Sequence, residues 1–344
     1  MNIDWFFIIE KIALISGVLA LSLGVAMYST WGERKVAAII QDRRGPNRAG
    51  FMGLLQPLAD GGKLFFKEEI IPTLSHRFLF ILGPSLAMLV ACMTSAVIPW
   101  GDTLTIGGRQ VSLQIADINI GILYIFGVVS LGVYGIMLGG WASNNKYSLL
   151  ASIRAASQII SYELAMGLSL IALLMLTGSL SLKDIVEQQR HSYWNVVYQP
   201  LGFIIFLICA FAECNRTPFD LPEAENELNG GYHLEYSSMK LGFYLFAEYI
   251  NMFISSALMA SMYFGGYSFP FMDSLGLDAN LITILGFVAL FIKIICFLFL
   301  FMWVRWTIPR FRYDQLMRLG WNIMIPIAIV NMLLTGAWIL YKQG

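Results

Sequence analysis

The stretch "NLITILGFVALFIKIICFLFLFMWV", residues 280–304, decides the fold class. Its 25 residues hold one charged side chain, Lys293. A helix needs roughly 20 mainly apolar residues to cross the ~30 Å hydrocarbon layer of a membrane. The stretch is therefore predicted to form a membrane-spanning helix.

The same pattern recurs along the chain, which is 58% hydrophobic and 13% charged, with a mean hydropathy of +0.68. These values lie outside the range of soluble domains. They predict an all-α polytopic membrane protein, one integral membrane domain over residues 1–344 with about eight transmembrane helices and an interfacial amphipathic helix. The predicted spans are approximately 6–30, 78–98, 119–140, 150–177, 201–215, 240–264, 280–304 and 321–341.

Two segments between the spans show their own patterns. The stretch "FMGLLQPLADGGKLFFKEE", residues 51–69, mixes apolar and polar positions as an amphipathic helix at the membrane surface does, although Gly61-Gly62 weakens that prediction. Residues 99–118 alternate apolar and polar side chains around Gly107-Gly108, which predicts a β-hairpin.

Orientation is predicted from Lys and Arg, which accumulate on the cytoplasmic side of membrane proteins. Counted from the first loop between predicted spans, these residues concentrate in the first, third, fifth and seventh loops, above all 31–77 and 305–320. We therefore expect loops 31–77 and 216–239 to be cytoplasmic and both termini to be periplasmic. No small-residue cleavage site follows the first apolar stretch, so we expect it to stay as a span.

The cysteines and histidines do not have the spacing of metal ligands. Four cysteines are scattered along the sequence, and three histidines fall outside the predicted spans. No pattern fits zinc or an iron–sulfur cluster. We expect no metal in this chain, so any redox centre would belong to a partner.

Three charged residues fall deep inside predicted spans, well away from the ends: Glu163, Glu248 and Lys293. Each costs about 2.5 to 3.5 kcal/mol at a helix centre on insertion scales, so such residues usually face a bundle interior, a partner charge or water. One interpretation is a structural ion pair of Lys293 with Glu248 or Glu163. The other is a proton path, because burial and neighbouring like charges favour carboxyl groups that bind and release protons near neutral pH.

A second concentration of acids lies in "AECNRTPFDLPEAENELNGGYHLEY", residues 212–236. Six acids accompany one basic residue, Arg216. Capping of a short helix explains two acids at most, and Glu223 and Glu227 would repel each other at a spacing of four residues. We interpret the cluster as functional. The six acids are Glu213, Asp220, Glu223, Glu225, Glu227 and Glu235.

Five motifs resemble one known family along nearly the whole chain. They are "ERKVAAIIQDRRGPNRAG" (33–50), "LLQPLADGGKLFFKE" (54–68), "WASNNKYSLLASIRAASQIISYE" (141–163), "AECNRTPFDLPEAENELNGGYHLEYSSMK" (212–240) and "PRFRYDQLM" (309–317). The chain resembles the quinone-chamber membrane subunit of respiratory complex I, which is the H-type subunit of the bacterial NADH-quinone oxidoreductase.

The resemblance implies site residues. At the quinone tunnel, the matching positions are Glu33, Arg34, Asp60, Phe219 and Arg305, with Gln56 also possible. The family's acidic funnel would comprise Glu163, Glu213, Glu223, Glu225, Glu227, Glu235 and Glu248, largely the residues that the charge pattern selects. Lys293 joins this proton path from the charge argument alone.

The implied function is that of a non-redox subunit of a proton-pumping NADH:quinone oxidoreductase, with no independent catalysis. Quinone is the substrate, and iron–sulfur clusters and FMN would belong to partner subunits. The implied partners are soluble subunits on the cytoplasmic face, small membrane subunits, and the lipid of a bacterial inner membrane, but no nucleic acid.

Three alternatives remain open from the sequence. The first is the anchor subunit of a related membrane-bound hydrogenase or ferredoxin/F420-linked complex. The second is a stand-alone proton-coupled transporter. The third is a structural anchor whose acids only pair with basic residues of docked subunits.

Overall fold

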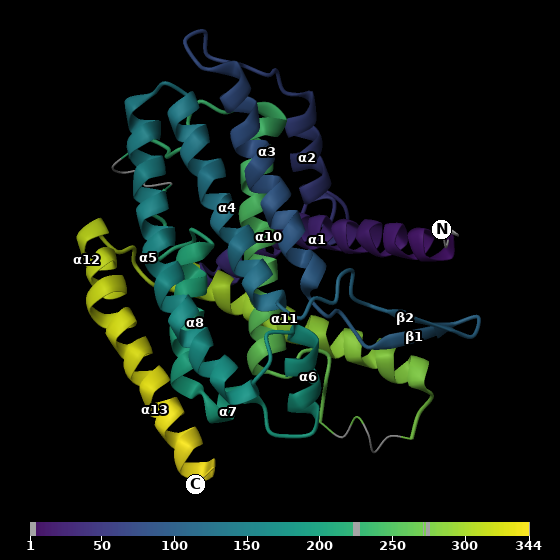
Figure 1. The fold of residues 1–344 in the computed structure, drawn as a ribbon. Coiled ribbons are helices and arrows are strands. Elements are labelled where there is room, and N and C mark those ends of the chain that lie inside the picture. Colours follow the sequence, from purple (N-terminus) through teal and green to yellow (C-terminus); the bar gives the residue numbers. More distant parts are fainter. Residues whose placement is uncertain (1–4, 223–227, 271, 273–275, 344) are drawn as a thin grey trace.

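The computed structural model describes residues 5–222, 228–270, 272 and 276–343 (Figure 1). Within these residues, seven helices are long and apolar enough to cross a membrane, which confirms the predicted helical membrane fold. They are α1 (Trp5–Ile40), α3 (Arg77–Thr94), α4 (Gly121–Ala142), α5 (Lys146–Thr177), α10 (Ser238–Tyr263), α11 (Ala279–Thr307), and a last helix that joins α12 (Tyr313–Arg318), the π-helical η4 (Leu319–Met324) and α13 (Ile325–Gln343). Short 3-10 turns are η1 (Phe51–Gly53) and η2 (Ser95–Val97).

The predicted span 201–215 corresponds to the shorter helix α8 (Pro200–Glu213), which has 14 residues. At a rise of 1.5 Å per residue, its length is about 21 Å. Pro200 suits the first turn of a helix, and the chain leaves the helical conformation at Asn215, whose φ is 51°. The single turn α7 (Asn195–Tyr198) precedes α8, and α6 (Leu182–Arg190) precedes both.

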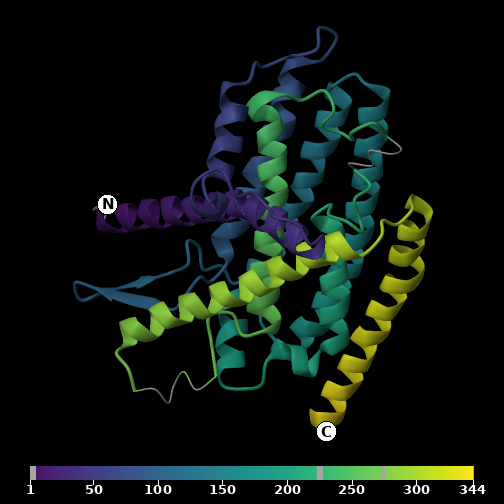
Figure 2. The ribbon, with the colours of Figure 1, turned by 180° about the vertical axis from the view of Figure 1, so that it is seen from behind.

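Helix α1 continues beyond the predicted span 6–30 to Ile40, because "WGERKVAAII" contains no proline and only one glycine, Gly32. Figures 1 and 2 show α1 and α11 crossing the group of roughly parallel helices α3, α4, α5 and α10 at a large angle. A strongly tilted helix needs more residues to cross the same thickness. The 36 residues of α1 and the 29 residues of α11 fit that arrangement.

The predicted hairpin is confirmed. Strands β1 (Thr103–Ile106) and β2 (Arg109–Ser112) pair in antiparallel register around Gly107 and Gly108, which both have positive φ as a tight two-residue turn requires.

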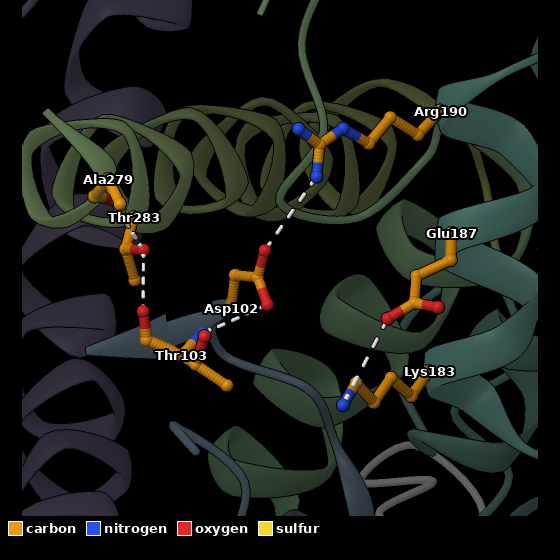
Figure 3. Close-up of polar contacts among 7 residues, drawn as sticks. All are labelled: Asp102, Thr103, Lys183, Glu187, Arg190, Ala279 and Thr283. Carbon is orange, nitrogen blue, oxygen red and sulfur yellow. Dashed lines mark hydrogen bonds and ion pairs between the residues drawn. The ribbon is translucent and has the colours of Figure 1, made fainter. Parts of the chain in front are cut away.

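Contacts of the hairpin region tie three helices together at one end of the bundle. Thr283 of α11 donates its hydroxyl to the Thr103 carbonyl at 3.0 Å, and Arg190 of α6 lies 3.7 Å from Asp102 (Figure 3). Lys11 of α1 donates to the carbonyl of Ile115 at 2.9 Å.

The predicted amphipathic helix is present as α2 (Gln56–Phe66), which contacts α1 and α10. Its apolar residues Leu58 and Phe65 are exposed on the isolated chain, whereas Pro57 is buried. Its position in the plane of the membrane surface remains a prediction.

Helix α10 packs on α3, and two tyrosines, one of α10 and one just before it, reach backbone carbonyls of α4. Tyr244 donates its hydroxyl to the Gly135 carbonyl at 3.0 Å, and Tyr236 donates to the Gly139 carbonyl at 3.2 Å. Burial raises the pKa of Tyr236 well above its usual value, so this hydroxyl stays protonated and remains a donor. A Cβ atom at Gly139 would lie 1.9 Å from the Tyr244 hydroxyl, so only glycine fits there.

Candidate functional site

A cavity of about 410 Å³ lies between α1, α2, α10 and α11. Its walls combine charged groups with apolar side chains, a composition typical of sites for small amphipathic molecules. The ionisable residues that line it are Glu33, Arg34, Asp60, Lys63, Arg216, Tyr249 and Arg305.

Two ion pairs stand at this cavity, and they differ in burial. Arg305 of α11 lies 2.6 Å from Glu33 of α1, with side chains 21% and 10% exposed. Arg34 lies 2.6 Å from Asp60 of α2, with side chains 51% and 36% exposed. Because solvent screens exposed charges, the Glu33 pair is the stronger electrostatic contact.

The structure thus brings together four of the six residues that the resemblance implies for a quinone site. Gln56 lies next to them, because its side-chain amide donates to Asp60 at 3.0 Å. Phe219 is not among the residues lining this cavity. It is buried, and its ring packs against Tyr162 and Phe311.

A series of side-chain contacts leads from this cavity into the helix bundle. Tyr249 of α10 donates its hydroxyl to Glu33 at 2.8 Å, and its ring lies 4.3 Å from the guanidinium carbon of Arg216. Arg216 lies 3.4 Å from the carboxylate of Glu248, with both side chains buried. Tyr232 donates its hydroxyl to Glu248 at 3.0 Å. Glu33 and Glu248 are therefore connected through the side chains of Tyr249 and Arg216.

Beyond Glu248, two small cavities share Glu213 of α8 in their walls. One holds about 40 Å³ and is also lined by Glu248, Tyr232 and Asn251. The other holds about 20 Å³ and is lined mainly by apolar residues together with Ser255. A water molecule needs roughly 10–15 Å³ of such space and a few polar partners. The larger cavity meets both conditions, so water can bridge Glu248 and Glu213.

Two further predicted acids have hydrogen-bond donors. Glu163 lies near the middle of α5, is half-buried, and accepts a hydrogen bond from Ser130 of α4. It is close enough to Glu213 for the two carboxyl groups to interact electrostatically. Glu235 accepts a hydrogen bond from the Asn145 side chain at 2.7 Å.

Three predicted acids, Glu223, Glu225 and Glu227, lie outside the described residues.

Lys293 has a different environment from the one that the sequence suggests. Its ammonium group donates to the carbonyls of Phe264, Gly266 and Ser268 at 2.6–2.7 Å, next to the end of α10. Glu248 lies 15 residues before Tyr263, the last residue of α10, or about 22 Å along the helix. In place of the ion pair with Glu248 or Glu163 that the sequence suggests for Lys293, the structure shows hydrogen bonds to these backbone carbonyls.

Sequence reasoning missed three hydroxyl groups that contact predicted acids: those of Tyr249, Tyr232 and Ser130. Tyrosine and serine in apolar stretches are usually part of the packing, so the residue type alone gives no signal. For Tyr249, a weak signal is its position directly after Glu248 in "FAEYINMF". All three contacts join residues at least 16 positions apart in sequence, so they become visible only in three dimensions.

The described part of the chain contains no group of three or more His, Cys, Asp or Glu side chains that could hold a metal ion. Its four cysteines are free thiols.

The sequence matches the family described as NADH dehydrogenase over residues 12–336. An H-type subunit of NADH-quinone oxidoreductase from Cytophaga hutchinsonii is 67% identical over 340 residues, which cover 99% of each chain. The H-type subunit from Flavobacterium psychrophilum is 66% identical over 339 residues, covering 98% of this chain and 99% of the relative. An H-type subunit from Geobacter metallireducens is 50% identical over 332 residues, covering 96% of each. The chain therefore belongs to the NADH dehydrogenase family, together with the H-type subunits of NADH-quinone oxidoreductase.

Proposed function

We propose that the 410 Å³ cavity is this chain's part of a quinone site. We further propose that the acidic residues of the chain couple quinone reduction to proton movement in the assembled oxidoreductase. The cavity's apolar side chains suit a quinone ring and tail. Its cations suit the negative charge that reduction adds to the headgroup, because charge stabilisation is strongest in a site that excludes water.

The contact series from Glu33 to Glu248 is the observation that carries this proposal. Two charges 4 Å apart interact by about 4 kcal/mol at an effective dielectric constant near 20. Charge arriving next to Arg305 therefore perturbs Glu33. The perturbation reaches Arg216 and Glu248 through Tyr249, and the cavity beyond Glu248, which has room for water, offers the route to Glu213 and Glu163.

The remaining expectations complete the proposal. In a bacterial inner membrane, soluble partner subunits would cover the cavity from the cytoplasmic side and carry the iron–sulfur clusters and FMN. Small membrane subunits would lie beside the bundle, and both termini would be periplasmic. Phe219, Gln56 and Lys293, as well as the three acids outside the described residues, keep their predicted roles as part of this proposal.

Tyr249→Phe in the assembled complex tests the contact series. This change removes the hydroxyl that donates to Glu33 and keeps the ring beneath Arg216. A hydrogen bond to a charged group contributes about 1.5–3 kcal/mol, so we expect NADH:quinone turnover to fall about tenfold or more. Assembly should be unchanged.

Tyr162→Phe is the matched control, because it removes another buried tyrosine hydroxyl, one that donates only to the Leu316 carbonyl at 3.0 Å. Equal turnover in wild type and Tyr249→Phe would refute the role of the series.

The same preparations separate the alternatives. The family match favours NADH-quinone oxidoreductase over the hydrogenase-type anchor, whose activity would resist quinone-site inhibitors. A stand-alone transporter would move protons as an isolated chain in liposomes. A structural anchor would lose assembly in Glu163→Gln, whereas we expect that variant to assemble and to lose turnover and pumping.

A further inference from the structure

The hydroxyl of Ser130 faces two hydrogen-bond acceptors at once. One is the carboxyl group of Glu163 on the neighbouring helix α5. The other is the carbonyl oxygen of Phe126, one turn earlier on α4, at 2.8 Å. A serine hydroxyl has a single proton and can accept as well as donate. At any moment Ser130 therefore donates to one of these two groups.

The protonation state of Glu163 decides which group receives that proton. When Glu163 is ionised, its oxygens can only accept, so Ser130 donates to the carboxylate. When Glu163 is protonated, its own O–H can donate to the Ser130 oxygen, and the Ser130 proton turns to the Phe126 carbonyl. In both states Ser130 and Glu163 stay hydrogen-bonded to each other, and only hydrogen atoms move.

We propose that Ser130 is a positioning residue for Glu163, which holds that carboxyl group in one place in both protonation states by turning its hydroxyl between the carboxyl and the Phe126 carbonyl. This inference deepens the proposed proton path and rests on it. In such a path, a carboxyl group that gains and loses a proton without moving stays aligned with its neighbours.

Few charged residues of the helices packed on α5 lie near Glu163, so we assign the positioning of its carboxyl group to Ser130. Helix α4 carries no charged residue. On α8, the carboxyl group of Glu213 interacts with Glu163. The other charged residues of the helices packed on α5 lie toward the ends of the last helix: Asp314 and Arg318 in α12, and Lys342 in α13.

Two other serines show what a purely structural hydroxyl looks like in this bundle. Ser157 of α5 donates to the Ile153 carbonyl, and Ser85 of α3 donates to the Ile81 carbonyl, each at 2.8 Å. These bonds repeat the Ser130–Phe126 bond, and among the described residues neither hydroxyl has a carboxyl group as a partner. Ser157→Ala is therefore the matched control.

Infrared spectroscopy of the assembled complex tests the proposal. The carboxylic C=O band that Glu163→Gln removes is assigned to Glu163 and followed as the pH is raised. Loss of the Ser130 donor disfavours the ionised carboxylate, so in Ser130→Ala the band should shift in frequency and persist to a pH about half a unit higher or more. Ser130→Thr keeps a hydroxyl and should restore the wild-type band, and Ser157→Ala should leave it unchanged.

An unchanged band and unchanged titration in Ser130→Ala would overturn the proposal. If that variant does not assemble, Ser130→Cys, which nearly keeps the side-chain size and has a much weaker donor, should show the same direction of shift, and a wild-type band there would also overturn it. Failure of the proposed function is a separate result, because normal pumping in Glu163→Gln would remove the proton path while the effect of Ser130 on the Glu163 band could still be measured.

Discussion

At the scale of single residues, Lys293 shows how a charge is accommodated in an apolar helix. An ammonium group has three N–H donors, and Lys293 directs them to three backbone carbonyls beside the C-terminal end of α10. A cation in that position also interacts favourably with the helix dipole. The cost of placing the charge in the membrane is offset by these bonds, so a structural role is as well supported as a role in proton transfer.

Replacing Lys293 with Met distinguishes these two roles. The change leaves the Phe264, Gly266 and Ser268 carbonyls without their common donor, and each buried unsatisfied group costs about 1–3 kcal/mol. We expect the yield of assembled complex on native gels to fall several-fold. The control is Lys342→Met, because Lys342 is exposed and contacts the ring of Trp338. Normal assembly with lost pumping would support proton transfer through Lys293 instead.

The two ion pairs at the cavity should respond differently to the loss of their arginine. Arg305→Gln leaves the buried Glu33 without its cationic partner, and breaking a fully buried pair costs about 3–5 kcal/mol. The partial exposure of Arg305 reduces that figure. Arg34→Gln breaks an exposed pair, which contributes about 0–1 kcal/mol. In thermal unfolding of the purified complex, Arg305→Gln should therefore show the larger loss of stability, and equal losses would contradict the assigned burial.

At the scale of elements, the contact of Tyr244 of α10 with α4 requires glycine at position 139. A Cβ atom at Gly139 would overlap the Tyr244 hydroxyl, whereas at Gly127 on the same helix it would meet nothing of the chain within 4 Å. We expect Gly139→Ala to push α10 away from α4 and to reduce assembly. Gly127→Ala should be neutral or stabilising, because alanine favours a helix over glycine by about 1 kcal/mol. Comparing yield and thermal stability of the two variants checks this, and similar behaviour would argue against close packing at Gly139.

The helices themselves could be predicted from the sequence, because the length of an apolar run sets the length of a span. The hairpin around Gly107-Gly108 was predictable for a similarly local reason. The tilt of α1 and α11 was not, since it depends on packing between distant helices. The sequence also selected Glu33 and Glu248 without revealing the link between them. Tyr249 follows Glu248 directly, yet its hydroxyl partner lies 216 residues away in the chain.

At the scale of the whole molecule, the proposed path crosses the bundle from the cavity between α1 and α10 to the pair of helices α4 and α5. Tyr249 stands near one end of this path and Glu163 near the other. Neither side chain contacts the other, and Arg216, Glu248 and Glu213 lie between them.

A double variant tests whether these two ends act in series. Effects of distant substitutions on free energies usually add. If Tyr249→Phe and Glu163→Gln block one path, the double variant should pump as many protons as the single variant that pumps less. A second interruption of a path that is already blocked reduces pumping little further. Tyr249→Phe combined with Tyr162→Phe is the control pair and should show additive effects. Proton pumping measured per electron in vesicles decides between the outcomes, and full additivity for Tyr249 and Glu163 would show that they act independently.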